Sequence, residues 1–283
     1  MKNEILILGI IKDGEKTLEK EVKNIQNSFL SFNKIHWFVV ESDSSDKTTK
    51  VLEKLNSLNE NFNYASLGDL SNDIPGRLER IAYCRNLCLE EMNSSNKYKK
   101  CQYVVVADLD GVNNLLTKNS VESCWEVNKN WDMCSANQKG PYYDISALRH
   151  QKWCPNNCWQ DYSNFLKDGI SEEESLSKAV LSKMISIPES EDFIEVLSSF
   201  GGLAIYKRKY LELSSYGHLD ENKNEVCEHV ILHKKMIENG AKLYINPKLI
   251  NGGLNEHSKQ ILCRYKIWRK MKNFLKPILK KLT

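Results

Sequence analysis

The sequence predicts an α/β protein whose mostly parallel sheet is covered by helices on both faces. Short apolar runs that suit buried strands alternate with longer segments whose apolar residues recur at helical spacing. The clearest run, Val104 to Val106, consists of β-branched residues, which favour a buried strand. A chain of 283 residues is long enough for one large unit of this kind with a sizeable core.

The first 115 residues show this alternation most regularly. A strand is expected at 4–11, and the spacing of Leu18, Val22 and Ile25 predicts a helix within 16–32. The same patterns then predict a strand from 35 that runs into a polar turn, a helix at 46–58 capped by Asp46, a short strand at 63–67, a helix at 76–92 and a strand from 101 to Asp108. Strands separated by helices in this way favour parallel pairing.

After residue 115 the pattern is less regular. Residues 142–162 are rich in aromatic side chains and are expected to form loops, and 181–199 mix a helix end with polar turns. A strand is expected at 200–211, entered through two glycines. A helix that stops at Gly240 and a closing strand are expected within 226–250.

We predict one domain at 1–262, with halves at about 1–115 and 116–262, and a basic amphipathic helical tail at 263–283. The tail has eight lysines and arginines and no acidic residue; without them, 32 of the 40 basic residues remain against 37 acidic ones, a net charge of −5. Such a segment suits peripheral contact with an anionic membrane, although packing on the body or against a partner would also explain it. Because the basic residues lie in a tail without an RNA or DNA motif, no nucleic-acid partner is expected.

The cysteines and the N-terminus favour a cytoplasmic protein. Nine cysteines is an odd number, and the apolar run at 4–11 is too short, and too soon followed by charge, for a secretory signal. Cys84 and Cys88, like Cys154 and Cys158, lack the spacing typical of zinc ligands, so we expect buried thiols there. No segment approaches the roughly 20 apolar residues of a membrane-spanning helix.

Acidic residues follow two of the predicted strands. Glu41 and Asp43 lie in ESDSSDKT after the second strand, and Asp108 and Asp110 lie in DLDG after the fourth. Ligands of such sheets bind beyond the carboxyl ends of the strands, so these four carboxylates can converge. Neighbouring carboxylates repel each other unless something positive lies between them, which favours a divalent cation with phosphate, or a phosphoryl group attacked by one aspartate. A plain polar loop is the alternative.

Four stretches, in order, resemble one enzyme family: ESDSSDKT, RIAYCRN, VVVADLDG, and GGLAIYKR followed by CEHVILHKKM. The family is the metal-dependent nucleotide-sugar glycosyltransferases of the GT-A (Rossmann-like) fold, especially those that build bacterial and fungal capsule or cell-surface polysaccharides. The likeness covers about residues 4–257. It implies a nucleotide-binding first half, an acceptor-binding second half, a nucleotide-sugar donor, a glycan or lipid-linked acceptor, and a place at the cytoplasmic face of the inner membrane.

The resemblance also assigns the metal and nucleoside ligands. Asp110 would be a direct ligand of Mn²⁺ or Mg²⁺, with Asp108 nearer the ribose or a metal-bound water, and His257 would be a further metal ligand. Oxygen ligands suit these cations, and the ion would stabilise the charge on the leaving diphosphate. Glu41 and Asp43 would contact the nucleoside; an acidic turn that caps the next helix is their alternative explanation.

Arginines and a helix start supply the remaining donor-side and catalytic candidates. Arg85 matches the family's arginine beside the donor, and Arg77 and Arg80 are further candidates because guanidinium groups bind phosphate bidentately. Glu228 matches, by position, the acidic residue that deprotonates the acceptor in inverting branches, and His229 could assist it or bind phosphate. The sequence leaves inversion or retention open.

Acceptor-binding candidates lie in the aromatic segment. Tyr142, Tyr143 and Asp144 are expected to contact the acceptor, because sugars present apolar faces to aromatic rings and hydroxyls to carboxylates. Trp153 and Trp159 are equally compatible with a sugar site and with a core.

Two other functions fit part of the sequence. DLDG also resembles the nucleophile loop of haloacid-dehalogenase phosphatases, but three predicted strands precede it and no downstream acidic pair such as GDxxxD follows. A non-catalytic, membrane-attached carbohydrate-binding protein is the second alternative. A nucleotidyltransferase would need a glycine-rich loop after the first strand, and GIIKDGEKT lacks that pattern.

Overall fold

The computed structural model describes residues 2–126 and 129–254 of the chain. The predicted tail at 263–283 and the candidate metal ligand His257 lie outside these residues. Among the described residues, none of the helices combines the length and the apolar character that crossing a bilayer requires.

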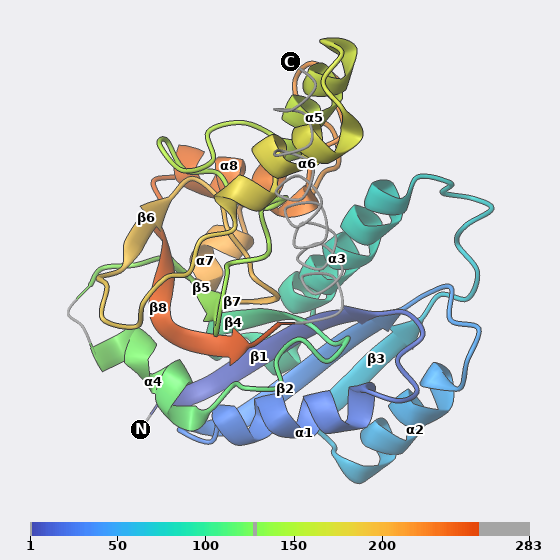
Figure 1. Ribbon diagram of the computed structural model, residues 1–283. Coiled ribbons are helices and arrows are strands. Elements are labelled where there is room, and N and C mark those ends of the chain that lie inside the picture. The colour runs from blue at the N-terminus through green and yellow to red at the C-terminus, as the bar shows by residue number, and fades with distance from the viewer. Residues whose placement is uncertain (1, 127–128, 255–283) are drawn as a thin grey trace, which may run out of the picture.

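A mixed sheet of eight strands forms the centre of the molecule, in the order β3-β2-β1-β4-β7-β5-β8-β6 (Figure 1). The strands are β1 Lys2–Ile11, β2 Phe32–Glu41, β3 Phe62–Ser66, β4 Cys101–Asp108, β5 Met133–Gln138, β6 Ile194–Val196, β7 Leu203–Lys207 and β8 Leu243–Gly252. Strands β3, β2, β1 and β4 are parallel to one another, as are β5 and β8. Strand β7 runs antiparallel between β4 and β5 and joins the two parallel groups into one sheet. The predicted α/β sheet is therefore confirmed.

Helices cover both faces of this sheet (Figure 1). They are α1 Leu18–Ser28, α2 Thr48–Leu58, α3 Arg77–Ser94, α4 Lys118–Glu126, α5 Cys158–Lys167, α6 Glu172–Ala179, α7 Arg208–Leu211 and α8 Glu228–Glu238. Alternate residues of β4 point to opposite cores: Val104 and Val106 pack with residues of α3 and α8, and Val105 packs with residues of α1, α2 and α4. This double burial explains the continuous apolar runs of the central strands.

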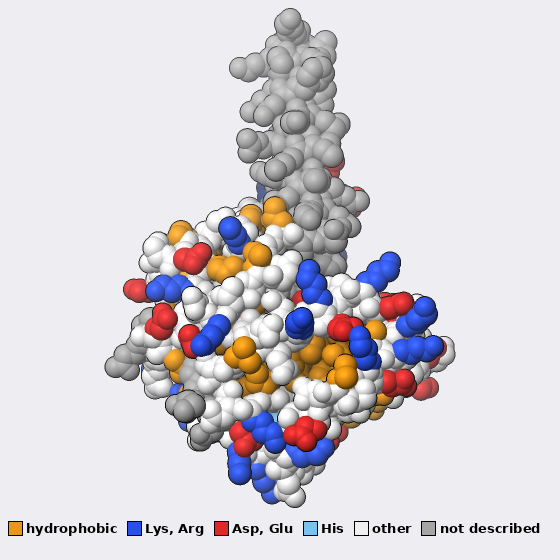
Figure 2. Space-filling view, turned by 90° about the horizontal axis from the view of Figure 1, so that it is seen from below, with side chains coloured by type: hydrophobic (Ala, Val, Ile, Leu, Met, Phe, Trp, Pro, Cys, Tyr) orange, Lys and Arg blue, Asp and Glu red, His pale blue; other side chains and the backbone are white. Residues whose placement is uncertain are grey.

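The face seen in Figure 2 carries acidic and basic side chains interspersed among apolar ones. Charges of both signs in close alternation produce no extended positive field over this face.

One local expectation in the first half needs correction. Asp46 is not the N-cap of α2; Lys47 occupies that position, and the Asp46 carboxylate instead accepts the backbone N–H groups of Thr48 and Glu15. The first helix, by contrast, lies within the predicted range 16–32: it ends at Ser28, and the chain enters β2 at Phe32.

The sequence pattern also misses short elements in the second half. These are α4, β5, α5, α6 and β6, each of ten residues or fewer. Strand β5 reads MCSANQ and is buried at all six positions, so neither alternation nor a β-branched run marks it.

Candidate functional site

A cavity of about 450 Å³ opens at the carboxyl ends of β1, β2 and β4, an edge of the sheet that we call the carboxyl edge. Parallel strands bring their following loops together there, as the sequence pattern requires. The structure places the following predicted residues around this one cavity: Asp43, Arg77, Arg80, Arg85, Asp108, Asp110, Tyr143, Asp144, Glu228 and His229. Lys12 joins them from the loop after β1.

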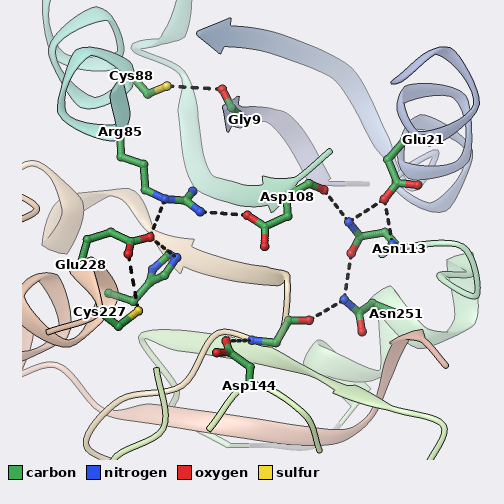
Figure 3. Close-up of polar contacts among 12 residues, drawn as sticks. Gly9, Glu21, Arg85, Cys88, Asp108, Asn113, Asp144, Cys227, Glu228 and Asn251 are labelled. Carbon is green, nitrogen blue, oxygen red and sulfur yellow. Dashed lines mark hydrogen bonds and ion pairs between the residues drawn. The ribbon is translucent and has the colours of Figure 1, made fainter. Parts of the chain in front are cut away.

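Arg85 is the central charge of the site (Figure 3). It lies on α3 with only 5% of its surface exposed, and its Nε donates to Glu228 Oε1 while its Nη2 donates to Asp108 Oδ1, both at 2.9 Å. The guanidinium also packs over the Phe200 and Tyr216 rings. Its Nη1 is buried and has no hydrogen-bond partner among the described residues. One arginine thus links the end of β4 to the start of α8, 143 residues away.

The two aspartates after β4 differ in their surroundings. Burial raises the pKa of Asp108 to about 7 against the lowering influence of Arg85, and the charges of Asp110, Glu228 and Asp144 raise it further. Asp110, by contrast, is exposed and makes no hydrogen bond or ion pair with any described residue. Its carboxylate oxygens are therefore available to a ligand that enters the cavity.

The loop that carries Asp110 is held by a buried polar network that the sequence does not reveal (Figure 3). Asn113 donates its backbone N–H and its side-chain Nδ2 to Glu21 Oε1, at 2.7 and 2.9 Å, and also donates Nδ2 to the Asp108 carbonyl. Asn251 of β8 donates to Asn113 Oδ1 at 2.9 Å. Asn113 lies within DLDGVNN and could be suspected from that motif, whereas Glu21 and Asn251 show no sequence signal.

Asp144 and Tyr143 form the opposite wall of the cavity, from the aromatic segment before α5. Asp144 Oδ2 accepts the Gly201 N–H at 2.9 Å, and burial raises the pKa of the Asp144 carboxyl. The backbone at Gly202 has a positive φ of 86°, and a Cβ there would meet Val112 at 2.7 Å and the Tyr143 hydroxyl at 3.0 Å. The two glycines that precede β7 therefore let this wall approach the Asp110 loop closely.

Glu228 and His229 begin α8 and lie behind Arg85. The His229 ring stacks on Phe200 at a centroid distance of 3.8 Å and is 2% exposed. Burial, with smaller contributions from the Arg85 charge and from His233, lowers the pKa of His229 well below its ordinary value. His229 is thus neutral near pH 7, which does not favour the phosphate-binding role considered for it.

Glu41 and Asp43, the two residues predicted to contact the nucleoside, lie in different surroundings at the end of β2. Asp43 lines the cavity with a positive φ of 59°, and its Oδ1 accepts the N–H groups of Leu70 and Ser71. Glu41 is buried outside the cavity lining, where its carboxylate accepts the Ser44 N–H and the Ser66 hydroxyl. Glu41 therefore shapes the loop that presents Asp43.

Three aromatic candidates also lie outside the cavity lining. Tyr142 is fully buried and packs edge-on against Trp153, whose Nε1 donates to the Lys183 carbonyl. Trp159 is 45% exposed on α5. Of the predicted acceptor residues, the structure brings Tyr143 and Asp144 to the cavity, whereas Tyr142 belongs to the core.

The donor groups of the cavity fit a hard divalent cation. Asp108 and Asp110 offer only oxygen atoms, which suit Mn²⁺ or Mg²⁺, and Asp110 has no partner among the described residues that a cation would displace. Asp110 is therefore the group best placed to hold such an ion, with Asp108, whose Oδ1 is engaged by Arg85, beside it.

Comparison with known proteins gives a structural likeness only. No known family model and no curated protein sequence matches the chain. The mannosyltransferase PcManGT from Pyrobaculum calidifontis, solved with GDP-Man and Mn²⁺, has a TM-score of 0.50 and 14% sequence identity, over 87% of this chain and 55% of that one. At this identity the likeness establishes a shared fold, which confirms the predicted GT-A-type architecture. The chain spans about half the length of that enzyme.

Two further similar structures have lower scores. GalNAc-T7 with UDP, GalNAc and Mn²⁺ has a TM-score of 0.48 and 14% identity, over 88% of this chain and 43% of that one. TarS 1–349 from S. aureus with UDP-GlcNAc has a TM-score of 0.46 and 14% identity, over 92% and 61%.

Proposed function

We propose that the protein is a glycosyltransferase that moves a sugar from a nucleoside-diphosphate sugar to an acceptor, with Mn²⁺ or Mg²⁺ bound at the carboxyl edge. The observation that carries the proposal is the buried pairing of Arg85 with Asp108 and Glu228 directly beside the unpaired carboxylate of Asp110. Five carboxylates and four basic side chains line the cavity, so a cation beside Asp110 would help to offset the negative charge of an entering diphosphate. The fold shared with PcManGT, a mannosyltransferase solved with GDP-Man and Mn²⁺, supports the same assignment.

The residues of the cavity divide into a donor side and an acceptor side. We assign the diphosphate to Asp110, with its cation, and to Arg85, whose buried Nη1 lacks a partner among the described residues. When bound, the cation would stabilise the negative charge of the leaving diphosphate. Asp43 would hold the nucleoside, and Arg77, exposed at the rim, would hold phosphate oxygens.

Two carboxylates compete for the role of general base in this proposal. Glu228 was expected to deprotonate the acceptor hydroxyl, but the residue is buried and its Oε1 already accepts a hydrogen bond from Arg85 Nε at 2.9 Å, which limits the access of an acceptor to its carboxylate. Asp144 is half-buried on the opposite wall, with a raised pKa and Tyr143 beside it. We therefore favour Asp144 as the base and assign to Glu228 the positioning of Arg85.

The decisive experiment is a panel of nucleoside-diphosphate sugars, scored for nucleotide release and sugar transfer with and without Mn²⁺ or Mg²⁺. We expect one donor to be turned over only with the metal. Asp110→Asn should lower kcat/KM roughly a hundredfold or more, because it removes part of a charge stabilisation of several kcal/mol. Asp168→Asn, exposed and outside the cavity lining, is the matched control and should keep full activity. In the same assay, Asp144→Asn should lower kcat more than Glu228→Gln does.

Three outcomes would contradict the proposal. Full activity of Asp110→Asn would show that Asp110 does not hold a cation needed for the reaction. Release of phosphate from phosphomonoesters, dependent on Asp108, would favour a phosphatase, although Asp108 is engaged by Arg85. Saturable sugar binding without turnover of any donor would favour the non-catalytic carbohydrate-binding protein.

We further propose that the acceptor is a glycan or lipid-linked glycan of a surface polysaccharide, reached from the cytoplasmic face of the inner membrane through the tail at 263–283. The support is the basic, apolar composition of that tail. Protein truncated before Arg264 should no longer sediment with anionic liposomes, while the full chain should. Equal sedimentation of both proteins would contradict this membrane role.

A further inference from the structure

A second cluster of metal-ligating side chains lies away from the cavity, in the amino-terminal half of the same strands. It consists of Glu4 on β1, His36 on β2 and Cys101 on β4. Glu4 lies directly beside Cys101 in the sheet, and His36 pairs with Leu6, two residues further along β1. The cavity begins at the other end of these strands, at Ile10, Val40 and Asp108. The cluster and the cavity therefore lie toward opposite ends of the same three strands.

A register shift between β1 and β4 is what aligns Cys101 with Glu4. Ile5 pairs with Tyr103, so regular pairing would place Gln102 beside Glu4; the shift between Glu4 and Ile5 places Cys101 there instead. Cys101 consequently joins the core on the α3 face, and Gln102 is exposed. Bulges of this kind redirect a side chain, and here the redirected side chain is a potential metal ligand.

The three ligand atoms are close enough for one ion. The Nε2 of His36 lies 3.0 Å from Oε2 of Glu4, and all three ligand atoms lie within 4.8 Å of one another. In a tetrahedral zinc site with bonds of about 2.0 to 2.3 Å, neighbouring ligand atoms are separated by about 3.3 to 3.8 Å. Small side-chain rotations would therefore close the cluster around an ion.

Burial leaves one side of the cluster open. Cys101 and His36 are buried, at 1% and 4% exposure, and the His36 ring is packed edge-on by Tyr98. The Glu4 side chain is 22% exposed, so an ion can enter beside it and keep a water molecule as its fourth ligand. One nitrogen, one sulfur and one oxygen donor favour Zn²⁺ over the hard cations that the oxygen ligands of the carboxyl edge suit.

We propose that Glu4, His36 and Cys101 form a zinc-binding site that links β1, β2 and β4, separate from the proposed catalytic cation site. A bound ion would connect three neighbouring strands through their side chains and stabilise this half of the sheet. Without the ion, Glu4 and His36 are joined by a hydrogen bond between Oε2 and Nε2.

Cobalt titration of the full chain, stripped of metal by a chelator, tests the site, because Co²⁺ in place of Zn²⁺ reports thiolate ligation by absorption in the near ultraviolet. We expect one thiolate-ligated Co²⁺ per chain, seen as a thiolate-to-cobalt band that Zn²⁺ removes and that excess Mn²⁺, which fills the carboxyl edge, leaves unchanged. Cys101→Ser should lose the band. His36→Gln and Glu4→Gln should weaken binding by roughly tenfold or more, since loss of even an outer-shell partner costs that much in other metal sites.

Control variants separate this site from other thiols and from the carboxyl edge. The Sγ atoms of Cys124 and Cys134 lie 3.4 Å apart in the core, so Cys134→Ser tests that thiol pair and should keep the band. Asp110→Asn should also keep it, which makes failure here distinguishable from failure of the proposed activity. Glu4→Gln, partly exposed and able to keep a hydrogen bond to His36, guards against misfolding of the buried variants. No band in the wild-type protein, a band that survives Cys101→Ser, or displacement by Mn²⁺ would overturn the proposal.

Discussion

The two ends of strands β1, β2 and β4 carry different chemistry. Beyond the carboxyl ends, side chains come from loops and helices and offer oxygen atoms and guanidinium groups, as Asp110 and Arg85 do. In the amino-terminal half, His36 and Cys101 project from the strands themselves and are buried. Loops allow a site to be open and adaptable, whereas strands fix it between neighbours. In the two proposals, one sheet holds an exchangeable cation and substrate at one end and a fixed ion at the other.

Charge compensation also differs between the ends. At the carboxyl edge, Glu228 and Asp108 depend on a single buried arginine. In the amino-terminal half, Glu4 has His36 as its partner and remains partly exposed to water. Removing a partner should consequently cost much more at the carboxyl edge.

The largest effect on stability is expected from Arg85→Met. This change leaves Glu228 buried without its cation, and removing one member of a buried ion pair typically costs about 3 to 5 kcal/mol. Urea denaturation monitored by circular dichroism would measure the free energy of unfolding. The double variant Arg85→Met/Glu228→Gln should recover part of the loss, because it removes the uncompensated charge. His36→Gln is the matched variant at the other end of the strands. If Arg85→Met lowers the free energy of unfolding by no more than His36→Gln does, the two ends do not differ as expected.

The sequence identified most of the carboxyl edge because its residues follow strands that are regular in pattern. The strand pattern alone is enough to place Asp43, Asp108 and Asp110 there, since parallel strands bring their loops to one side. Neighbours in sequence were harder to separate: Glu41 is buried while Asp43 lines the cavity, and Tyr142 is buried while Tyr143 lines it. A shift of one or two residues along the chain decides whether a side chain points into the core or into the cavity. The residue type alone does not reveal this direction.

Long-range pairing accounts for what the sequence could not predict. The partner of Arg85 lies 143 residues away, and Asn251 reaches the Asp110 loop across 138 residues. Cys101 joins Glu4 and His36 only because of a register shift. These three potential metal ligands are far apart in the sequence, so no short spacing motif of the kind sought among the other cysteines marks them. Such groupings depend on the order of strands in the sheet, which local patterns do not determine.

A smaller effect, dependent on pH, is expected behind the carboxyl edge at His233. Its ring is fully buried between the Ser198 hydroxyl, 2.8 Å from Nδ1, and the Tyr206 hydroxyl, 3.0 Å from Nε2. Burial lowers the pKa of His233 to about 3 from its ordinary value of 6.5. Between these values the unfolded chain binds a proton that the folded chain does not, so stability is retained above pH 6.5 and falls as the pH decreases. From pH 7 to pH 5 the loss from this one group should be about 2 kcal/mol.

His233→Gln should remove that part of the pH dependence, since glutamine does not titrate and retains groups for both hydrogen bonds. The measurement is the free energy of unfolding in urea at pH 7, 6 and 5 for the wild-type protein and the variant. His218→Gln, at a partly exposed histidine, is the matched control and should follow the wild-type curve. If His233→Gln loses as much stability as the wild-type protein over this range, His233 contributes nothing to the loss and the prediction is wrong. The decrease in the free energy of unfolding between pH 7 and pH 5 would then not arise from this part of the molecule.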